Sequence, residues 1–138
     1  MGCTYTTKEL KDITGPIAFC VSNEFVVPVK HDPCFKMSKY LRDNYARKDM
    51  FLGQRVGQVL TYKNKYALVT KVKDRSHPAQ YNATACLEAL NEICLNEDIK
   101  KITLCTDALV DIYGSEEEVI RRVRCAFSDK VTVCFIKE

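Results

Sequence analysis

The chain has 138 residues, of which 46% are hydrophobic and 28% are charged. This globular composition and length predict a single domain spanning residues 1–138. The net charge of +3 is too small to indicate a nucleic-acid partner. No apolar run approaches the ~20 residues that cross a bilayer, and no secretory signal opens the sequence. We therefore expect no membrane partner and an intracellular location, in the cytosol or nucleus.

The eight cysteines do not form a recognisable metal or redox motif. No Cys-x-x-Cys pair occurs, and His31 with Cys34 supplies only two ligands, so no metal or cofactor is expected. Most cysteines lie within apolar strand or helix patterns and are expected to be small buried hydrophobes in a reducing compartment. These are Cys20, Cys86, Cys94, Cys105, Cys125 and Cys134.

The first half of the chain contains short strand patterns and one capped helix. Residues 3–7 alternate and are rich in β-formers, which predicts an edge strand; the alternative is an acylation signal at Gly2. The apolar run 17–21 follows Gly15-Pro16 and predicts a buried strand. Asp32 followed by a proline is typical of a helix start.

The middle of the chain predicts a β-hairpin and then a long helix. Residues 56–62 and 66–72 are strand patterns around the turn Lys63-Asn64-Lys65. Residues 79–95 then have helical periodicity. The predicted buried stripe of this helix is Ala83, Leu87, Leu90 and Cys94.

The last third of the chain predicts two strands around a capped helix. Residues 102–106 and 131–136 are the strand patterns, and residues 107–111 are expected to form a loop after the first of them. Ser115 followed three positions later by Glu118 is a capping box. The inner face of the helix that follows is predicted to be Val119, Ile120, Val123 and Phe127.

Strands that alternate with helices predict a largely parallel sheet covered on both sides. Ligands of such α/β folds bind beyond the carboxyl ends of the strands. Lys71, where one strand ends, and the loop 107–111, which follows another, are therefore the first candidates for a functional site.

Four segments in the same order resemble one protein family. They are Ile17-Ala18-Phe19-Cys20-Val21-Ser22, Tyr66-Ala67-Leu68-Val69-Thr70-Lys71, Ser76-His77-Pro78 and Leu87-Glu88-Ala89-Leu90. The combination resembles macrodomains of the terminal ADP-ribose glycohydrolase type, over most of the chain. The resemblance implies a three-layer α/β fold with a mixed, mostly parallel central sheet flanked by helices. It also implies ADP-ribose, a related nucleotide or an ADP-ribosylated protein as the partner.

The resemblance assigns roles to particular residues. The lysine of this family attacks the distal ribose of ADP-ribose attached to an acidic side chain, and Lys71 matches it. Asp111 best matches the assisting aspartate, with Asp107 second. A lysine is nucleophilic only when neutral, so the chemistry needs desolvation or cationic neighbours at that amine. The positions expected to contact the ligand are Ser22, Lys30, His31, Asp107 and Tyr113, with Tyr113 as the stacking residue.

Three features depart from the family pattern and keep alternatives open. Thr6-Thr7 replaces a Gly-Asp pair, residues 25–32 lack the usual glycines, and Asp107 and Asp111 place carboxylates where a pyrophosphate is expected. The hypotheses are an ADP-ribosyl hydrolase, a module that binds ADP-ribose without turnover, and a degenerate macrodomain that serves as a protein-interaction module. For Lys71, Lys30 and His31 the alternative is a simple solvent-facing position.

Overall fold

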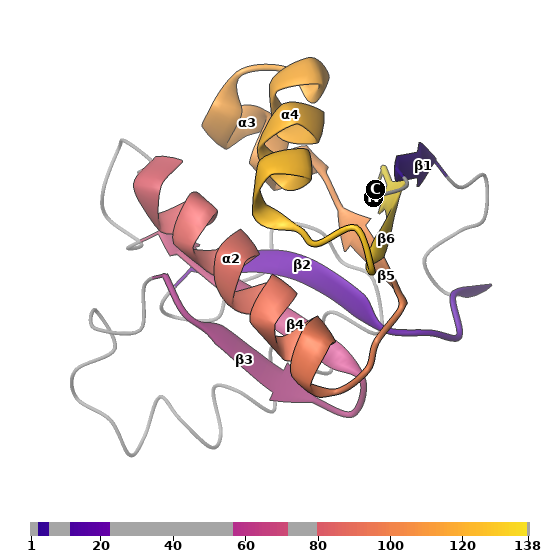
Figure 1. Ribbon diagram of the computed structural model, residues 1–138. Helices are drawn as coiled ribbons and strands as arrows, with labels where there is room; N and C mark the ends of the chain where they lie inside the picture. The colour runs from indigo at the N-terminus through magenta and orange to yellow at the C-terminus, as the bar shows by residue number, and fades with distance from the viewer. Residues whose placement is uncertain (1–2, 6–11, 23–56, 72–79, 138) are drawn as a thin grey trace, which may run out of the picture.

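Residues 3–5, 12–22, 57–71 and 80–137 are described by the structure, a computed structural model (Figure 1). Six strands form one sheet in the order β1-β6-β5-β2-β4-β3. All adjacent strands are parallel except β3 and β4, which are antiparallel. The strands are β1 (Cys3–Tyr5), β2 (Ile17–Ser22), β3 (Val59–Tyr62), β4 (Lys65–Lys71), β5 (Lys101–Cys105) and β6 (Thr132–Ile136). The predicted mixed, mostly parallel sheet is confirmed.

Both faces of the central strands are buried, as the sequence predicts. Ile102 and Leu104 point to one face of β5, and Thr103 and Cys105 point to the other, yet all four are at most 5% exposed. Alternation between an apolar and a polar face is therefore absent from this strand, which is typical of a parallel sheet covered on both sides.

The predicted hairpin is formed by β3 and β4. Lys63 and Asn64 connect the two strands, and both have a positive φ, 45° and 68°. Positive φ at both central residues gives a two-residue turn whose twist matches that of the flanking strands. Asparagine tolerates this conformation well. Leu60 and Ala67 face each other in the resulting antiparallel register.

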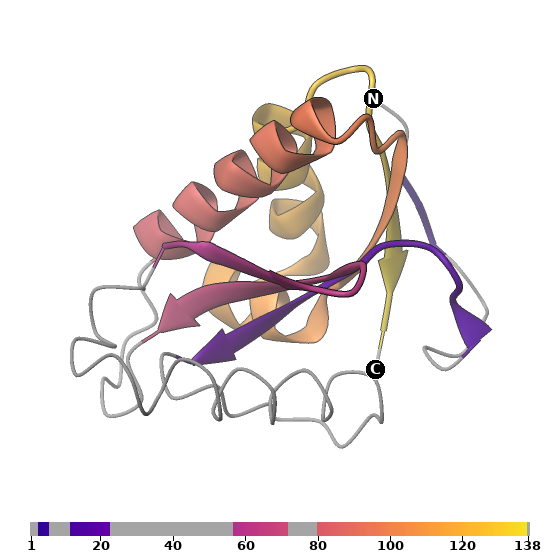
Figure 2. The ribbon, with the colours of Figure 1, turned by 90° about the horizontal axis from the view of Figure 1, so that it is seen from below.

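The helices α2 (Gln80–Asn96), α3 (Asp107–Tyr113) and α4 (Glu116–Ala126) follow the hairpin. Figure 2 shows α2 and α4 on the same side of the sheet. The buried stripe predicted for α2 is confirmed, since its members have no exposed surface; they are Ala83, Leu87, Leu90 and Cys94. Val119 and Val123 supply the buried face of α4, and Phe127, directly after the helix, is buried as well. Ile120 is half-buried against the same core.

The capping box at the start of α4 is formed in one direction only. The Ser115 hydroxyl accepts a hydrogen bond from the Glu118 amide at 3.2 Å, as predicted. The Glu118 carboxylate, which the full motif directs back to the Ser115 amide, instead contacts Arg121 and Arg122. Glu118, Arg121 and Arg122 thus form a charged cluster on the surface of α4.

Two predictions were wrong. The segment 107–111 is not a loop but most of α3, because Leu109 and Ile112 are buried one turn apart and give it an apolar face. The helix ends at Gly114, whose amide donates to the Val110 carbonyl at 2.7 Å. Cys125 is exposed rather than buried, since it lies on the outer face of α4.

Candidate functional site

The carboxyl ends of β2 and β4 lie side by side at one edge of the sheet (Figure 2). Ser22, the last residue of β2, is the register partner of Lys71, the last residue of β4. The register shifts between Val21 and Ser22, so the ladder is irregular at this pair. The structure thus brings the backbones of two predicted site residues together, while their side chains lie outside what it describes.

The two candidate aspartates lie on α3, which follows the carboxyl end of β5. Asp107 and Asp111 are both exposed and are separated by about one helical turn. Asp107 lies near Lys137: the Glu116 carboxylate raises the pKa of Lys137, and the charge of Asp107 adds a smaller effect in the same direction. Asp107 therefore belongs to a charged group near the end of β6.

Thr106 attaches the start of α3 to the neighbouring strand β6. Its amide donates to the Ile136 carbonyl at 3.1 Å, and its hydroxyl donates to the same oxygen at 3.3 Å. Both donors of this residue are thus used within the fold. The position of α3 after the carboxyl end of β5 is set by these bonds and by its buried apolar face.

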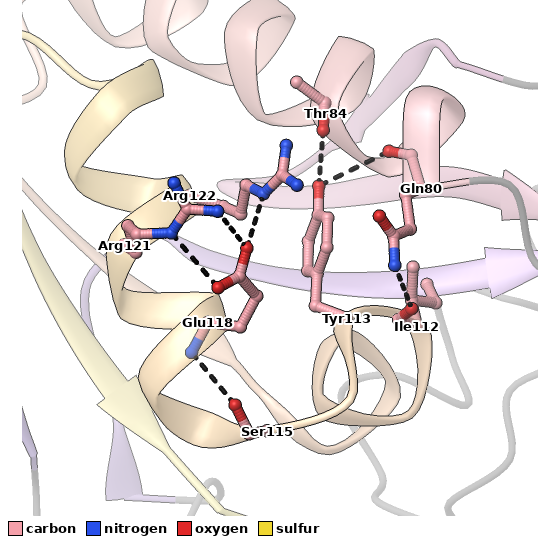
Figure 3. Close-up of polar contacts among 8 residues, drawn as sticks. All are labelled: Gln80, Thr84, Ile112, Tyr113, Ser115, Glu118, Arg121 and Arg122. Carbon is pink, nitrogen blue, oxygen red and sulfur yellow. Dashed lines mark hydrogen bonds and ion pairs between the residues drawn. The ribbon is translucent and has the colours of Figure 1, made fainter.

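Tyr113, the predicted stacking residue, lies between α2 and α4 and is 6% exposed (Figure 3). Its hydroxyl is 2.7 Å from the Thr84 hydroxyl and donates to the Gln80 carbonyl at 3.5 Å. Burial raises the pKa of this phenol. The Arg122 guanidinium lies over the ring, 5.3 Å from its centroid. The ring thus has packing and polar partners within the fold, and its stacking role stays a prediction.

A cluster that the sequence analysis missed surrounds Glu118 on α4 (Figure 3). Its carboxylate binds Arg121 and, at 3.0 Å, the Nε atom of Arg122. These hydrogen bonds lower the pKa of Glu118 from its ordinary value of 4.5 to about 2. The spacing of three and four residues was the available signal, because such pairs are neighbours on a helix.

The structure also contains a shallow groove that the sequence does not predict. It has a volume of about 570 Å³ and runs along the outer face of α2 beside α4. Among the described residues, its lining consists of Gln80, Tyr81, Thr84, Ala85, Glu88 and Arg122. The spacing within α2 marks one helical face, but the contribution of Arg122 depends on how the two helices pack.

The remaining predicted site residues, Lys30 and His31, lie outside the described residues. Within the described ranges, no group of three or more histidine, cysteine or acidic side chains is arranged to hold a metal ion. None of the described helices is long and apolar enough to cross a membrane.

Comparison with solved structures identifies the fold. The macrodomain of Mycobacterium tuberculosis DarG superposes with a TM-score of 0.70 at 13% identity, covering 99% of this chain and 98% of that one. The macrodomain of Thermus aquaticus DarG gives 0.67 at 16% identity, covering 99% and 97%. A macrodomain protein from Streptomyces coelicolor gives 0.63 at 10% identity, covering 99% of each chain. No protein-family model and no curated protein sequence matches. The chain therefore has the macrodomain fold, as the resemblance implies.

Proposed function

We propose that this chain recognises ADP-ribose, or a nucleotide related to it, at the carboxyl edge of its sheet. The proposal rests on the macrodomain fold over nearly the whole chain and on the pairing of Ser22 with Lys71 at that edge. Parallel α/β folds bind ligands there because strand ends and helix starts leave backbone groups available. The irregular register beside Ser22 supports this location, since sheet irregularities are common next to binding sites.

The proposed activity is removal of ADP-ribose from an acidic side chain of a modified protein. The Lys71 amine attacks the distal ribose carbon, forming a C–N bond as the C–O bond to the carboxylate breaks. The electron pair of the broken bond leaves with the carboxylate, and water then releases ADP-ribose and regenerates the amine. Asp111 assists by proton transfer and by stabilising the cationic character of the sugar in the transition state.

Turnover of a protein ADP-ribosylated on glutamate tests this activity. We expect Lys71→Ala to lower the rate by about 100-fold or more and Asp111→Asn by about 10-fold or more. Lys65→Ala is the matched control, because Lys65 lies at the opposite end of the same strand, and it should leave the rate unchanged. Equal turnover by wild type and Lys71→Ala at high protein concentration rules the mechanism out.

A degenerate macrodomain that serves as a protein-interaction module is the second candidate. The observation that favours it is α3, a helix with exposed carboxylates at Asp107 and Asp111 where a pyrophosphate is expected. Like charge disfavours such a ligand. Calorimetry separates the candidates: measurable heat with ADP-ribose supports recognition, whereas silence at about 1 mM ligand favours the degenerate module.

A further inference from the structure

The groove along α2 has one positively charged wall. Two guanidinium groups, those of Arg121 and Arg122, share the single carboxylate of Glu118, so these three side chains carry one net positive charge. The carboxylate that balances it within the groove, Glu88, lies on α2 and not on this wall. Arg122 forms the wall of the groove and is 34% exposed. An anionic group entering from solvent therefore meets a cation that its own partner has only partly neutralised.

Arg122 is held in one orientation before any partner arrives. Its Nε atom binds Glu118 at 3.0 Å, and its guanidinium lies over the Tyr113 ring. The Tyr113 hydroxyl is fixed in turn by Thr84, 2.7 Å away. Figure 3 shows the end of the guanidinium on the side of Thr84, toward α2. A side chain fixed in this way loses little conformational entropy on binding.

The floor of the groove is an elongated strip of α2 with small side chains in its middle. Tyr81, Thr84, Ala85 and Glu88 lie on one face of α2, at helical spacing. They span about 10 Å along the helix axis, since each residue adds about 1.5 Å. The small side chains of Thr84 and Ala85 lie in the middle, where a partner backbone can approach closely. This shape suits a stretch of polypeptide better than a single small anion.

The two ends of the floor differ in character. Tyr81 at one end is 80% exposed, and an aromatic ring of this kind is a typical anchor in protein interfaces. Glu88 at the other end is an exposed carboxylate, which disfavours a second acidic residue there. The groove therefore has an aromatic end, a cationic wall and an anionic end, so it can orient a bound segment.

We propose that this groove binds an acidic peptide segment of a partner protein. A glutamate or aspartate of the segment pairs with the Arg122 guanidinium, and an apolar side chain next to it covers Tyr81. The proposal does not depend on ADP-ribose recognition, because Arg122 and Tyr81, which contact the segment, are not among the residues assigned to the site at the carboxyl edge. Tyr113, the predicted stacking residue of that site, contributes here only by lying under the Arg122 guanidinium. The two ideas can therefore fail separately.

Nuclear magnetic resonance on the full chain tests the proposal. The probes are two pools of 12-residue synthetic peptides with identical apolar flanks, one with a central glutamate and the other with a central glutamine. The glutamate pool should shift the Arg122 side-chain Nε–H signal and the amides of Tyr81 and Ala85. The glutamine pool should bind at least about tenfold more weakly.

Variants decide whether the groove is responsible. Arg122→Gln should weaken binding of the glutamate pool by about tenfold or more, and Arg124→Gln, at an exposed position on the same helix, should change it by less than about twofold. Tyr81→Ala should also weaken binding, and its exposure means that the fold does not depend on it. Equal binding of both pools, or shifts confined to other parts of the chain at about 1 mM peptide, overturns the proposal. Inorganic phosphate that reproduces the same shifts also overturns it, because the groove would then recognise a simple anion.

Discussion

The hydroxyl groups of Tyr113 and Thr84 lie 2.7 Å apart and join the end of α3 to the first half of α2. Gln80 adds a second link between these helices, since its side-chain amide donates to the Ile112 carbonyl at 3.4 Å. The carboxyl end of α3 is thus fastened to the start of α2, and Arg122 packs on the ring that makes the link. One tyrosine therefore supports both the position of α3 and the wall of the groove.

Tyr113→Phe should destabilise the fold by about 1 kcal/mol, because the hydrogen bond is lost while the ring remains. Thr84 is only half-buried, so water can satisfy its hydroxyl and the cost should lie near the low end of the range. Urea unfolding measures the change. As a control, Tyr81→Phe removes a tyrosine hydroxyl from a side chain that is 80% exposed, and it should leave the free energy of unfolding almost unchanged. A matching loss in both variants would show that the Thr84 bond contributes nothing specific.

The ion pairs of Glu118 should make stability depend on pH below neutrality. Its pKa in the fold is about 2, below the ordinary value of 4.5, so the stabilisation is present above the ordinary value. It should be lost as the pH falls from about 5 toward 2. The carboxylate is on the surface, so high salt should reduce the effect.

Thermal unfolding across this pH range, in low and high salt, measures the contribution of Glu118. Glu118→Gln should flatten the acid side of the stability profile relative to wild type. Glu117→Gln removes a carboxylate from the same first turn but leaves the pair with Arg121 and Arg122 intact, and its profile should follow wild type. A Glu118→Gln profile that parallels wild type at low salt would contradict the assignment.

Much of the fold could be predicted because local patterns and the global structure agree. The run 17–21, the hairpin around Lys63 and Asn64, and the stripe that includes Leu87 and Leu90 each specify one element without help from distant residues. The helix α3 was missed because its segment is short and carries an aspartate at each end, and acidic residues before a glycine are also typical of turns. Its apolar face is recognisable only once its packing against α2 and α4 is known.

The candidate site was predictable only in part, for a different reason. The end of a strand, such as Lys71, can be located from sequence. Because ligands of α/β folds bind at the carboxyl ends of parallel strands, Ser22 at the end of β2 is then expected near it, and the two are register partners. The groove cannot be located in this way, because Thr84 and Arg122 come from separate helices. Their meeting depends on helix packing, which periodicity does not specify.

Cysteine labelling should separate Cys125 from the buried thiols. Cys125 is exposed, whereas Cys86 has no exposed surface. Burial raises the pKa of the Cys86 thiol to about 12, so almost no reactive thiolate is present near neutral pH. Iodoacetamide followed by peptide mapping should show alkylation of Cys125 at least about 100-fold faster than of Cys86. In denaturant the two rates should become similar, and a persistent difference there would point to a cause other than burial.

Glycine substitutions should distinguish backbone strain from crowding. A Cβ at Gly114 or at Gly15 meets no atom within 4 Å, but only Gly114 is in the left-handed region, with a φ of 99°. Gly114→Ala should therefore destabilise the fold by about 1 kcal/mol, because a side chain disfavours that conformation. Gly15→Ala should be neutral or slightly stabilising, since it restricts the unfolded chain without strain. Denaturant midpoints of the two variants measure the contrast. Equal midpoints would mean that the end of α3 adopts another backbone conformation at Gly114.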